Sequence, residues 1–347
     1  MMTTIKDVAQ RAGVSVATVS RVMNGSNKVS ETTKLRVLEV IEELSYRPNL
    51  LGRNLRKAET RKLLIMLPSI SNQFYSKIVR GMEARALLDR FNIMVCITNS
   101  NPETERSYIS LLTTRLADGI IFLSNEMDDD AISQIAAAYP IVQCCECTGA
   151  KTSKVSIDNR QAAYDAVSHL ISLGHRRIAM VSTEKKHPST VDREAGFRQA
   201  MEEHGLAVED RLLQYGTYSF QTGMCACDAL LALDSPPSAV FTIADSIAVG
   251  MVKQLLTKGL RPGPDMAVYG FDDTSIASLY TPSITTVAQP RYELGYTAMD
   301  LLLHKIKEID SPNQTVVLPH KLVLRESTRS GETGGPSGGR SGQEESI

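Results

Sequence analysis

Residues 4–25 read TIKDVAQRAGVSVATVSRVMNG, and their spacing predicts two short helices joined by a tight turn. Thr4 and Asp7 have the spacing of a capping box at the start of the first helix. Gly13 suits the left-handed residue that ends this helix, and Ser15 can cap the next one. The segment therefore favours a helix-turn-helix unit at the start of the chain.

The side chains of this unit divide into an inner and an outer set. The apolar positions expected to pack the two helices together are Val8, Ala9, Ala12, Val14, Val19 and Val22. The outer positions of the second helix are Val16, Ala17, Thr18, Ser20 and Arg21. A helix that presents small residues and one arginine near its N-terminal end suits the major groove of DNA. We therefore expect this helix to contact base edges.

A third helix is predicted over residues 30–45, with Ser30 as its cap. Its apolar spacing comes from Leu35, Val37, Leu38, Ile41 and Leu44. Pro48 interrupts the pattern, so the expected DNA-binding domain covers residues 1–48. Residues 49–62 are expected to form a short hinge helix and a charged linker.

The likeness to a known family extends beyond these helices, through SYRPN at 45–49 and GRNL at 52–55. Over roughly residues 3–329 the chain resembles the LacI/GalR family of bacterial transcription regulators. The resemblance implies that Val16, Ala17 and Arg21 occupy the base-reading positions. It also implies a hinge that folds on its operator and places Leu55 in the minor groove, where an apolar wedge kinks DNA.

The expected DNA contacts combine these base-reading positions with groups that suit phosphates. Arg21 can bind a guanine with two hydrogen bonds, whereas Val16 and Ala17 offer only apolar contact. The alternatives are a solvated surface arginine at position 21 and a leucine at 55 that packs on the linker. The other predicted DNA contacts are Thr4, Thr18, Asn24, Tyr46 and Arg56.

Composition supports a polyanion at one end of the chain. Residues 1–62 carry 12 Lys and Arg against 6 Asp and Glu, which leaves 26 against 33 in the remainder of the 347 residues. A basic head on an acidic body is typical of a nucleic-acid partner bound by the head alone, with strong salt dependence. No apolar leader or stretch long enough to span a membrane occurs, so we expect a cytoplasmic protein.

From residue 63 onward, β-rich apolar runs alternate with helical patterns, which predicts parallel sheets with crossover helices. The family resemblance implies a two-lobed core of the periplasmic-binding-protein type over 63–328. Lobe one is expected from 63–160 plus 291–328, and lobe two from 161–290. Residues 329–347 are rich in Gly and Ser and are expected to form a disordered tail.

Several polar residues follow predicted strands, where α/β sheets place ligands. One arginine and two aspartates, Arg193, Asp245 and Asp272, can bind vicinal hydroxyls while aromatic faces cover a ring. The alternatives are an ion pair between the lobes for Arg193 and Asp272, and a helix cap for Asp245. By resemblance, ligand contact is assigned to Phe74, Arg193, Tyr218 and Asp272, and with less support to Asp158, His187, Asp245 and Gln289.

The sequence motifs give little support to an enzymatic or metal-dependent function. The chain has no Walker loop and no G-x-G-x-x-G motif, and its cleft candidates contain no nucleophile, histidine and acid set. The run CCEC at 144–147 suggests a metal or redox site, but it lies in a predicted buried strand, where reduced cysteine behaves as a small hydrophobe. We therefore expect no enzyme, no cofactor and no bound metal.

The sequence thus predicts a homodimeric transcription regulator, a repressor, with operator DNA and a sugar or nucleoside effector as partners. SNQFY at 71–75 also resembles the catabolite-control branch of the family, which is switched by a phosphorylated carrier protein. That branch has basic residues where this chain has Asp300 and His304, and an acid repels phosphate. A solute-binding protein without a DNA role would not need the basic head.

Overall fold

The computed structural model describes residues 3–23, 25–26, 28–46 and 59–329. The chain separates into two compact units, Met1–Thr60 and Arg61–Ile347. Asn24, the predicted hinge helix with Leu55 and Arg56, and residues 330–347 of the predicted tail lie outside the described residues.

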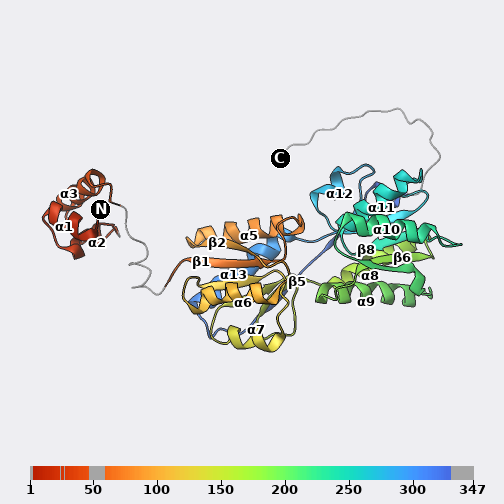
Figure 1. The fold of residues 1–347 in the computed structure, drawn as a ribbon, viewed down its shortest axis with the longest axis horizontal. Helices are drawn as coiled ribbons and strands as arrows, with labels where there is room; N and C mark the ends of the chain where they lie inside the picture. Colours follow the sequence, from red (N-terminus) through yellow and green to blue (C-terminus); the bar gives the residue numbers. More distant parts are fainter. Residues whose placement is uncertain (1–2, 24, 27, 47–58, 330–347) are drawn as a thin grey trace. The chain divides into compact units, whose positions relative to one another are not determined.

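The N-terminal unit contains three helices, α1 (Ile5–Ala12), α2 (Val16–Met23) and α3 (Glu31–Glu43) (Figure 1). The predicted capping box is present, because the Thr4 backbone N–H donates to Asp7 Oδ2 at 2.7 Å and Thr4 Oγ1 accepts from the Asp7 N–H. Gly13 ends α1 with φ 64°, a left-handed conformation that glycine adopts without a steric penalty. The local sequence therefore encodes both the start and the end of the first helix.

The core of this unit differs from the prediction on its third helix. Leu35 and Leu38, expected to face inward, are 57% and 44% exposed. Val37, which was predicted to face inward, and Val40, which was not, are buried, since they project from the side of α3 that contacts α1 and α2. The buried apolar set is Val8, Ala9, Ala12, Val19, Val22, Val37, Val40 and Tyr46.

The first lobe of the larger unit is built on a six-stranded sheet with the order β11-β5-β4-β3-β1-β2, in which all adjacent strands are parallel. Helices α5 and α13 cover one face, and α6 and α7 cover the other (Figure 1). Its elements are β1 (Lys62–Leu67), α5 (Phe74–Leu88), β2 (Asn92–Ile97), α6 (Pro102–Thr113), β3 (Gly119–Phe122), α7 (Asp129–Ala136), β4 (Ile141–Cys144), β5 (Ser153–Ile157), α13 (Arg291–Lys307) and β11 (Thr315–Leu318).

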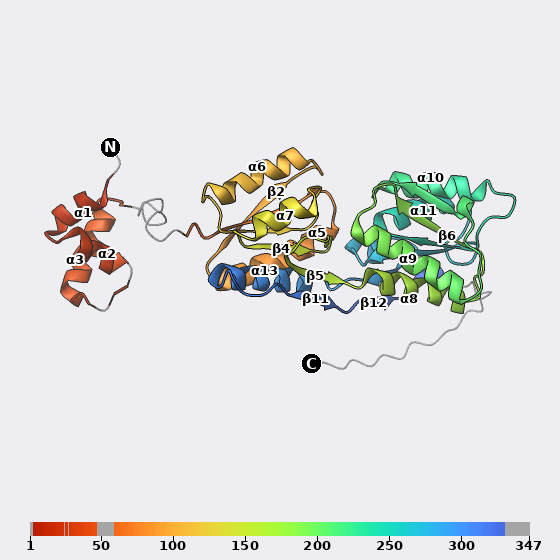
Figure 2. The same cartoon turned by 90° about the horizontal axis from the view of Figure 1, so that it is seen from below.

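The second lobe has the strand order β12-β10-β9-β8-β6-β7, parallel except for the antiparallel pair of β10 and β12. Helices α8 and α9 lie on one side of this sheet and α10 and α11 on the other (Figure 2). Its elements are α8 (Asn159–Ser172), β6 (Ile178–Thr183), α9 (Pro188–Glu203), η1 (Asp210–Leu212), β7 (Leu213–Gly216), α10 (Phe220–Leu231), β8 (Ala239–Thr242), α11 (Asp245–Thr257), β9 (Ala267–Asp272), α12 (Ser275–Leu279), β10 (Thr285–Ala288), β12 (Lys321–Val323) and η2 (Glu326–Thr328).

The chain passes between the two lobes three times, after β5, after β10 and after β11. The expectation that residues 291–328 all return to lobe one is wrong for the last segment. Strand β12 pairs with β10, and η2 packs on β9 and β10, so residues from Lys321 onward belong to lobe two. The short link of Pro319 and His320 between β11 and β12 was too brief to be recognised as a crossing.

Helices α5 and α13 approach each other closely because of two glycines. A Cβ on Gly81 would lie 2.1 Å from the Tyr292 carbonyl oxygen, and one on Gly295 would lie 1.9 Å from the Ile78 carbonyl oxygen. A side chain at either position would push the helices apart. This contact fixes the start of α13, which follows directly on a crossing between the lobes.

Candidate functional site

The outward face of α2 carries the predicted base-reading residues. Val16 is 39% exposed, and Ala17 and Arg21 are also exposed, whereas Val19 and Val22 are buried against the neighbouring helices. Within the described part of the chain, Arg21 makes no ion pair and no side-chain hydrogen bond. The helix therefore presents a smooth surface with one free guanidinium, as a helix that enters the major groove requires.

The other described residues predicted to contact DNA have structural partners. Thr4 Oγ1 donates to Asp7 Oδ2 at 2.8 Å within the capping box, and Thr18 Oγ1 lies 3.0 Å from Ser15 Oγ. The ring of Tyr46 is buried in the core of the head, with 9% of the residue exposed. Tyr46 therefore stabilises the head, whatever its hydroxyl contacts, and this packing role was missed in the sequence.

In the larger unit, the structure brings together Arg193 and Asp272, which were predicted from their positions after strands, and Gln289, which was assigned by resemblance. Gln289 Nε2 donates to Asp272 Oδ1 at 2.8 Å, and Arg193 Nη1 lies 3.8 Å from the same oxygen. Arg193 also donates to Asn159 Oδ1 at 2.9 Å and to the Ile243 carbonyl at 2.7 Å. Its guanidinium carbon lies 3.7 Å from the centre of the Phe271 ring, a cation–π contact.

Burial strongly affects the carboxyl group of this cluster. Desolvation raises the pKa of Asp272 to about 6, although the Arg193 charge and the Gln289 hydrogen bond act in the opposite direction. Asp272 also has φ 110°, a region that residues other than glycine rarely adopt. Such strain occurs where the surrounding structure fixes a residue for binding or switching. Together these groups form a polar centre in the interior of the protein.

Asp245 has a different role from the predicted ligand contact. It is 1% exposed, and its Oδ2 accepts from the Thr274 N–H at 2.6 Å and from Thr274 Oγ1 at 2.8 Å. Its Oδ1 accepts from Thr286 Oγ1 at 2.6 Å. Burial, followed by the charge of Asp272, raises its pKa to about 7. Both of its oxygens are thus bonded within the protein, and Asp245 ties α11 to Thr274, just before α12, and to β10.

The aromatic residues also divide into core and cleft positions. Phe74 is 8% exposed and belongs to the hydrophobic core, and its ring meets the Tyr75 ring edge-on at 5.3 Å between centroids. Burial raises the pKa of Tyr75 well above its ordinary value, and the charges of Glu146 and Asp272 contribute to the rise. Tyr75 therefore shares the surroundings of the polar centre. Tyr218, from lobe two, bonds through its hydroxyl to Thr190 Oγ1 at 3.0 Å.

Contacts between the lobes identify residues that sequence reasoning missed. Glu146 follows β4 in lobe one and accepts from the backbone N–H of Ser189 at 3.1 Å and from its hydroxyl at 2.5 Å, at the start of α9 in lobe two. Glu126 forms an ion pair with Lys185 across the same boundary. A pairing between residues so distant in sequence has no local pattern that could have predicted it.

Asn125 is a second missed candidate, placed just beyond β3. It is 8% exposed, and neither its Oδ1 nor its Nδ2 has a hydrogen-bond partner among the described residues. A buried amide without partners costs free energy, so this side chain is suited to bind a ligand or an ordered water.

Two other predicted ligand residues lie at helix starts in lobe two. Asp158 is exposed and caps α8, and His187 is the half-buried cap residue of α9 without a side-chain capping bond.

Comparison with known proteins identifies the family of this chain. Residues 4–49 match the model of bacterial regulatory proteins of the lacI family, and 167–328 match a periplasmic binding protein-like domain. The transcriptional regulator RegA of Clostridium saccharobutylicum is 38% identical, over 94% of this chain and 100% of its own length. The chain belongs to the lacI family. Its fold class of helix-turn-helix head and two-lobed α/β core is thereby confirmed.

Other members of the lacI family are almost as similar. Catabolite control protein A of Priestia megaterium is 35% identical over 95% of this chain and 100% of its own length. The repressor CytR of Escherichia coli K12 is 34% identical, over 94% and 96% of the two chains. The lac repressor dimer bound to operator superimposes with a TM-score of 0.86 at 26% identity, covering 95% of this chain and all of that one. The regulator CelR in complex with cellobiose gives 0.71 at 30%, covering 94% and 99%.

As a lacI-family protein, the chain is a DNA-binding transcription regulator and not an enzyme. Among the described residues, no group of three or more His, Cys, Asp or Glu could hold a metal ion. No helix in the described part of the chain is long and apolar enough to cross a membrane.

Asp300 and His304 on α13 are the residues on which the alternative of a phosphorylated carrier protein depends, and both lie close to charged partners. Asp300 on α13 accepts from Arg85 Nε at 2.7 Å, and Arg85 also bonds to Asp89 at 2.8 Å. His304 lies 4.0 Å from Glu308. The arginine that Asp300 binds is therefore balanced by two acids.

Proposed function

We propose that this lacI-family regulator is a cytoplasmic homodimer that represses transcription at an operator and responds to a sugar or nucleoside bound between its lobes. The base-reading residues are Val16, Ala17 and Arg21 on α2. The effector residues are Arg193, Asp272, Gln289 and Tyr218, with Tyr75, Asn125 and Glu146 added from the structure.

The observation that carries the effector proposal is the buried cluster of Arg193, Asp272 and Gln289. A guanidinium and a carboxylate supply the donor and the acceptors that two neighbouring hydroxyls need. The arginine also stacks on Phe271, which fixes its plane. Because these side chains are buried, water is excluded and hydrogen bonds from them to a ligand are stronger than in solvent. Glucose-like rings and the ribose of a nucleoside both present this pair of hydroxyls.

The lobes supply the switch. Glu146 of lobe one accepts hydrogen bonds from Ser189 of lobe two across the boundary. The effector cluster is near enough that the charge of Glu146 raises the pKa of Asp272. An effector that binds one lobe arrangement more tightly shifts the population toward it. Rotation of the lobes would change the separation of the two hinges in a dimer, and with it the fit of the heads to operator half-sites.

The test is an Asp272→Asn variant of the full-length protein. The substitution keeps the shape and the Gln289 contact but removes the ionised acceptor. We expect affinity for the effector, found by thermal-shift screening of sugars and nucleosides, to fall by about tenfold or more, since a decade is about 1.4 kcal/mol. Calorimetry measures this change. Operator affinity without effector should remain at the wild-type value.

The matched control is Arg198→Ala, which removes an exposed side chain that pairs with Glu194 on the same helix as Arg193. It should leave both affinities unchanged, because surface ion pairs contribute little. Wild-type effector affinity in Asp272→Asn, measured on folded protein, would refute the assigned centre.

A further inference from the structure

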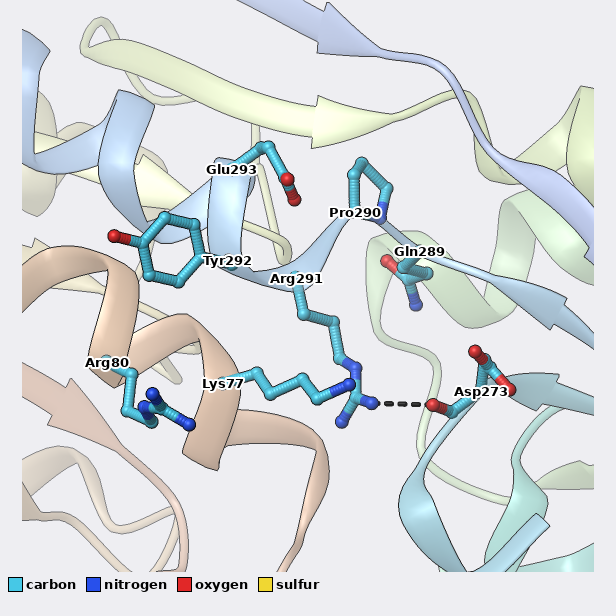
Figure 3. A pocket seen from close by; sticks show the side chains of 8 residues that line it. All are labelled: Lys77, Arg80, Asp273, Gln289, Pro290, Arg291, Tyr292 and Glu293. Atoms are coloured by element: carbon cyan, nitrogen blue, oxygen red, sulfur yellow. Dashed lines mark hydrogen bonds between the residues drawn. The ribbon is translucent and has the colours of Figure 1, made fainter. Parts of the chain in front are cut away.

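A pocket of about 310 Å³ lies where the chain crosses from β10 into α13. Figure 3 shows its lining, which comes from both lobes. Lobe one contributes residues of α5 and the first turn of α13, and lobe two contributes the ends of β9 and β10. The lining residues are Lys77, Arg80, Asp273, Gln289, Pro290, Arg291, Tyr292 and Glu293. We call this the crossover pocket.

Two of its cations are free. Lys77 and Arg80 lie three residues apart on α5, so they share one side of the helix. Both are exposed, and within the described part of the chain neither has an ion pair or a side-chain hydrogen bond. In Figure 3 the Lys77 side chain extends toward the Arg291 guanidinium rather than away from the pocket. Like charges that converge without a counter-ion favour an anion between them.

The third cation is fixed and lacks a carboxylate partner of its own. Arg291 is 4% exposed, and its Nη2 donates to the Asp273 carbonyl at 2.6 Å and its Nη1 to the Gln73 carbonyl at 3.4 Å. These are neutral acceptors, so no carboxylate hydrogen-bonds the guanidinium, although its charge also acts on Asp272. Two backbone carbonyls from different lobes hold it in place, and the close packing at Gly81 holds α13 against α5.

The acids of the crossover pocket do not cancel this charge. Asp273 Oδ1 is bound by Arg325 Nη2 at 2.7 Å, so its carboxylate is already compensated. The Glu293 carboxylate lies on the other side of the Arg291 backbone from the guanidinium (Figure 3). Lys77 and Arg291 therefore face one small space, which Arg80 also lines, with the Glu293 carboxylate at its edge.

We propose that the crossover pocket binds a phosphate group, either free or carried by a small phosphorylated metabolite. Planar arginine donors and a lysine ammonium form the charge-assisted hydrogen bonds that phosphate oxygens accept. The volume lies at the lower end of small-molecule sites, which suits a phosphate with a short organic part. Because both lobes line the pocket, a bound phosphate stabilises one arrangement of the lobes. The site thus adds an input distinct from the centre at Asp272, although Gln289 borders both.

The experiment measures binding of inorganic phosphate, ribose 5-phosphate and ribose to the full-length protein by calorimetry at low and high salt. The test variant is Lys77→Gln with Arg80→Gln. Its matched control is Arg106→Gln with Lys253→Gln, which removes two other exposed cations that have no ion pair among the described residues. We expect phosphate-bearing probes to bind wild type in a salt-dependent way and the test variant at least about tenfold more weakly. The control should match wild type.

The possible outcomes distinguish free phosphate from a phosphorylated metabolite, and they also distinguish this proposal from the effector proposal. Binding of inorganic phosphate identifies the phosphate alone as sufficient, and binding of ribose 5-phosphate only identifies a metabolite. Asp272→Asn should retain inorganic phosphate binding, so failure of the effector proposal leaves this one standing. No binding of either phosphate probe, or equal losses in both double variants, would overturn it.

Discussion

The outer face of α2 and the polar centre between the lobes are the two proposed binding surfaces, and they are built in opposite ways. Val16, Ala17 and Arg21 are exposed, and Arg21 has no partner in the described head. Arg193 and Asp272 are buried, and both are already hydrogen-bonded within the protein. A surface without internal partners can bind without first breaking bonds. A centre whose groups are satisfied must exchange protein partners for ligand.

This difference predicts how each surface responds to change. At α2, each substitution should alter DNA binding and leave the fold intact, because nothing in the head depends on those side chains. At the centre, substitution or ionisation should alter stability and ligand binding together. A buried group left without its partner costs about 1–3 kcal/mol even before any ligand is considered.

The largest effect should come from removing residues 1–60. The remaining residues form a separate compact unit, so the core should stay folded and bind effector normally. Operator binding should be lost, because all the predicted base contacts lie in the deleted part. Electrophoretic mobility shift with operator DNA, together with effector calorimetry, measures both. An unchanged operator affinity would mean that the head is not the DNA-binding surface.

The next effect should come from Arg21→Ala. Loss of a bidentate contact to guanine should cost about 1–3 kcal/mol, concentrated at one base pair in each half-site. Titrations on operators with single base changes would show whether the loss depends on sequence. Arg36→Ala removes an equally exposed charge from α3 and should cause only a small, sequence-independent loss. A uniform loss with Arg21→Ala would make this residue a phosphate contact.

The smallest effect on operator binding is expected at the buried Asp245, where the change is in the pH dependence of stability. Its pKa is raised from 3.8 to about 7, so between these values the folded protein binds more protons than the unfolded chain. This group therefore contributes stability that is present below pH 3.8 and is lost as the pH rises toward 7. Urea denaturation of wild type and Asp245→Asn across this range should show the difference.

The control is Asp310→Asn, which changes an exposed carboxylate. We expect the free energy of unfolding of Asp245→Asn to decline less between pH 4 and 7 than that of wild type, while Asp310→Asn follows wild type. Parallel curves for all three proteins would show that Asp245 is ionised throughout, and would weaken the contrast between the exposed face and the buried centre.

The sequence was most informative where structure is local. The capping box of Thr4 and Asp7 and the left-handed Gly13 require only neighbours within a few residues, and both appear as predicted. The third helix was found, and Val37, Ile41 and Leu44 pack inward as predicted, but Leu35 and Leu38 do not. These leucines are as apolar as Val37, and only packing decides which side chains are buried. Strand β7, with the sequence LQYG, lacks any apolar run and was not predicted.

The centre between the lobes was predictable only in part. Arg193 and Asp272 were found because strand ends in parallel sheets meet at one edge. Glu146 was missed because its partner Ser189 lies 43 residues away, with no spacing rule to connect them. The role of Asp245 depended on Thr274 and Thr286, and such bonds between separate elements become visible only when the fold is known.

The three crossings between the lobes have a consequence for how the protein is made. Helix α13 and strand β11 complete the first sheet and its helical layer, yet they are encoded after nearly all of lobe two. During synthesis, the ribosome must release residues beyond 318 before lobe one can close its core, whereas the three-helix head emerges complete within the first fifty residues. Domains fold as their sequences emerge. The nascent regulator therefore holds a finished DNA-binding head while its first lobe is still an open sheet that lacks its last strand.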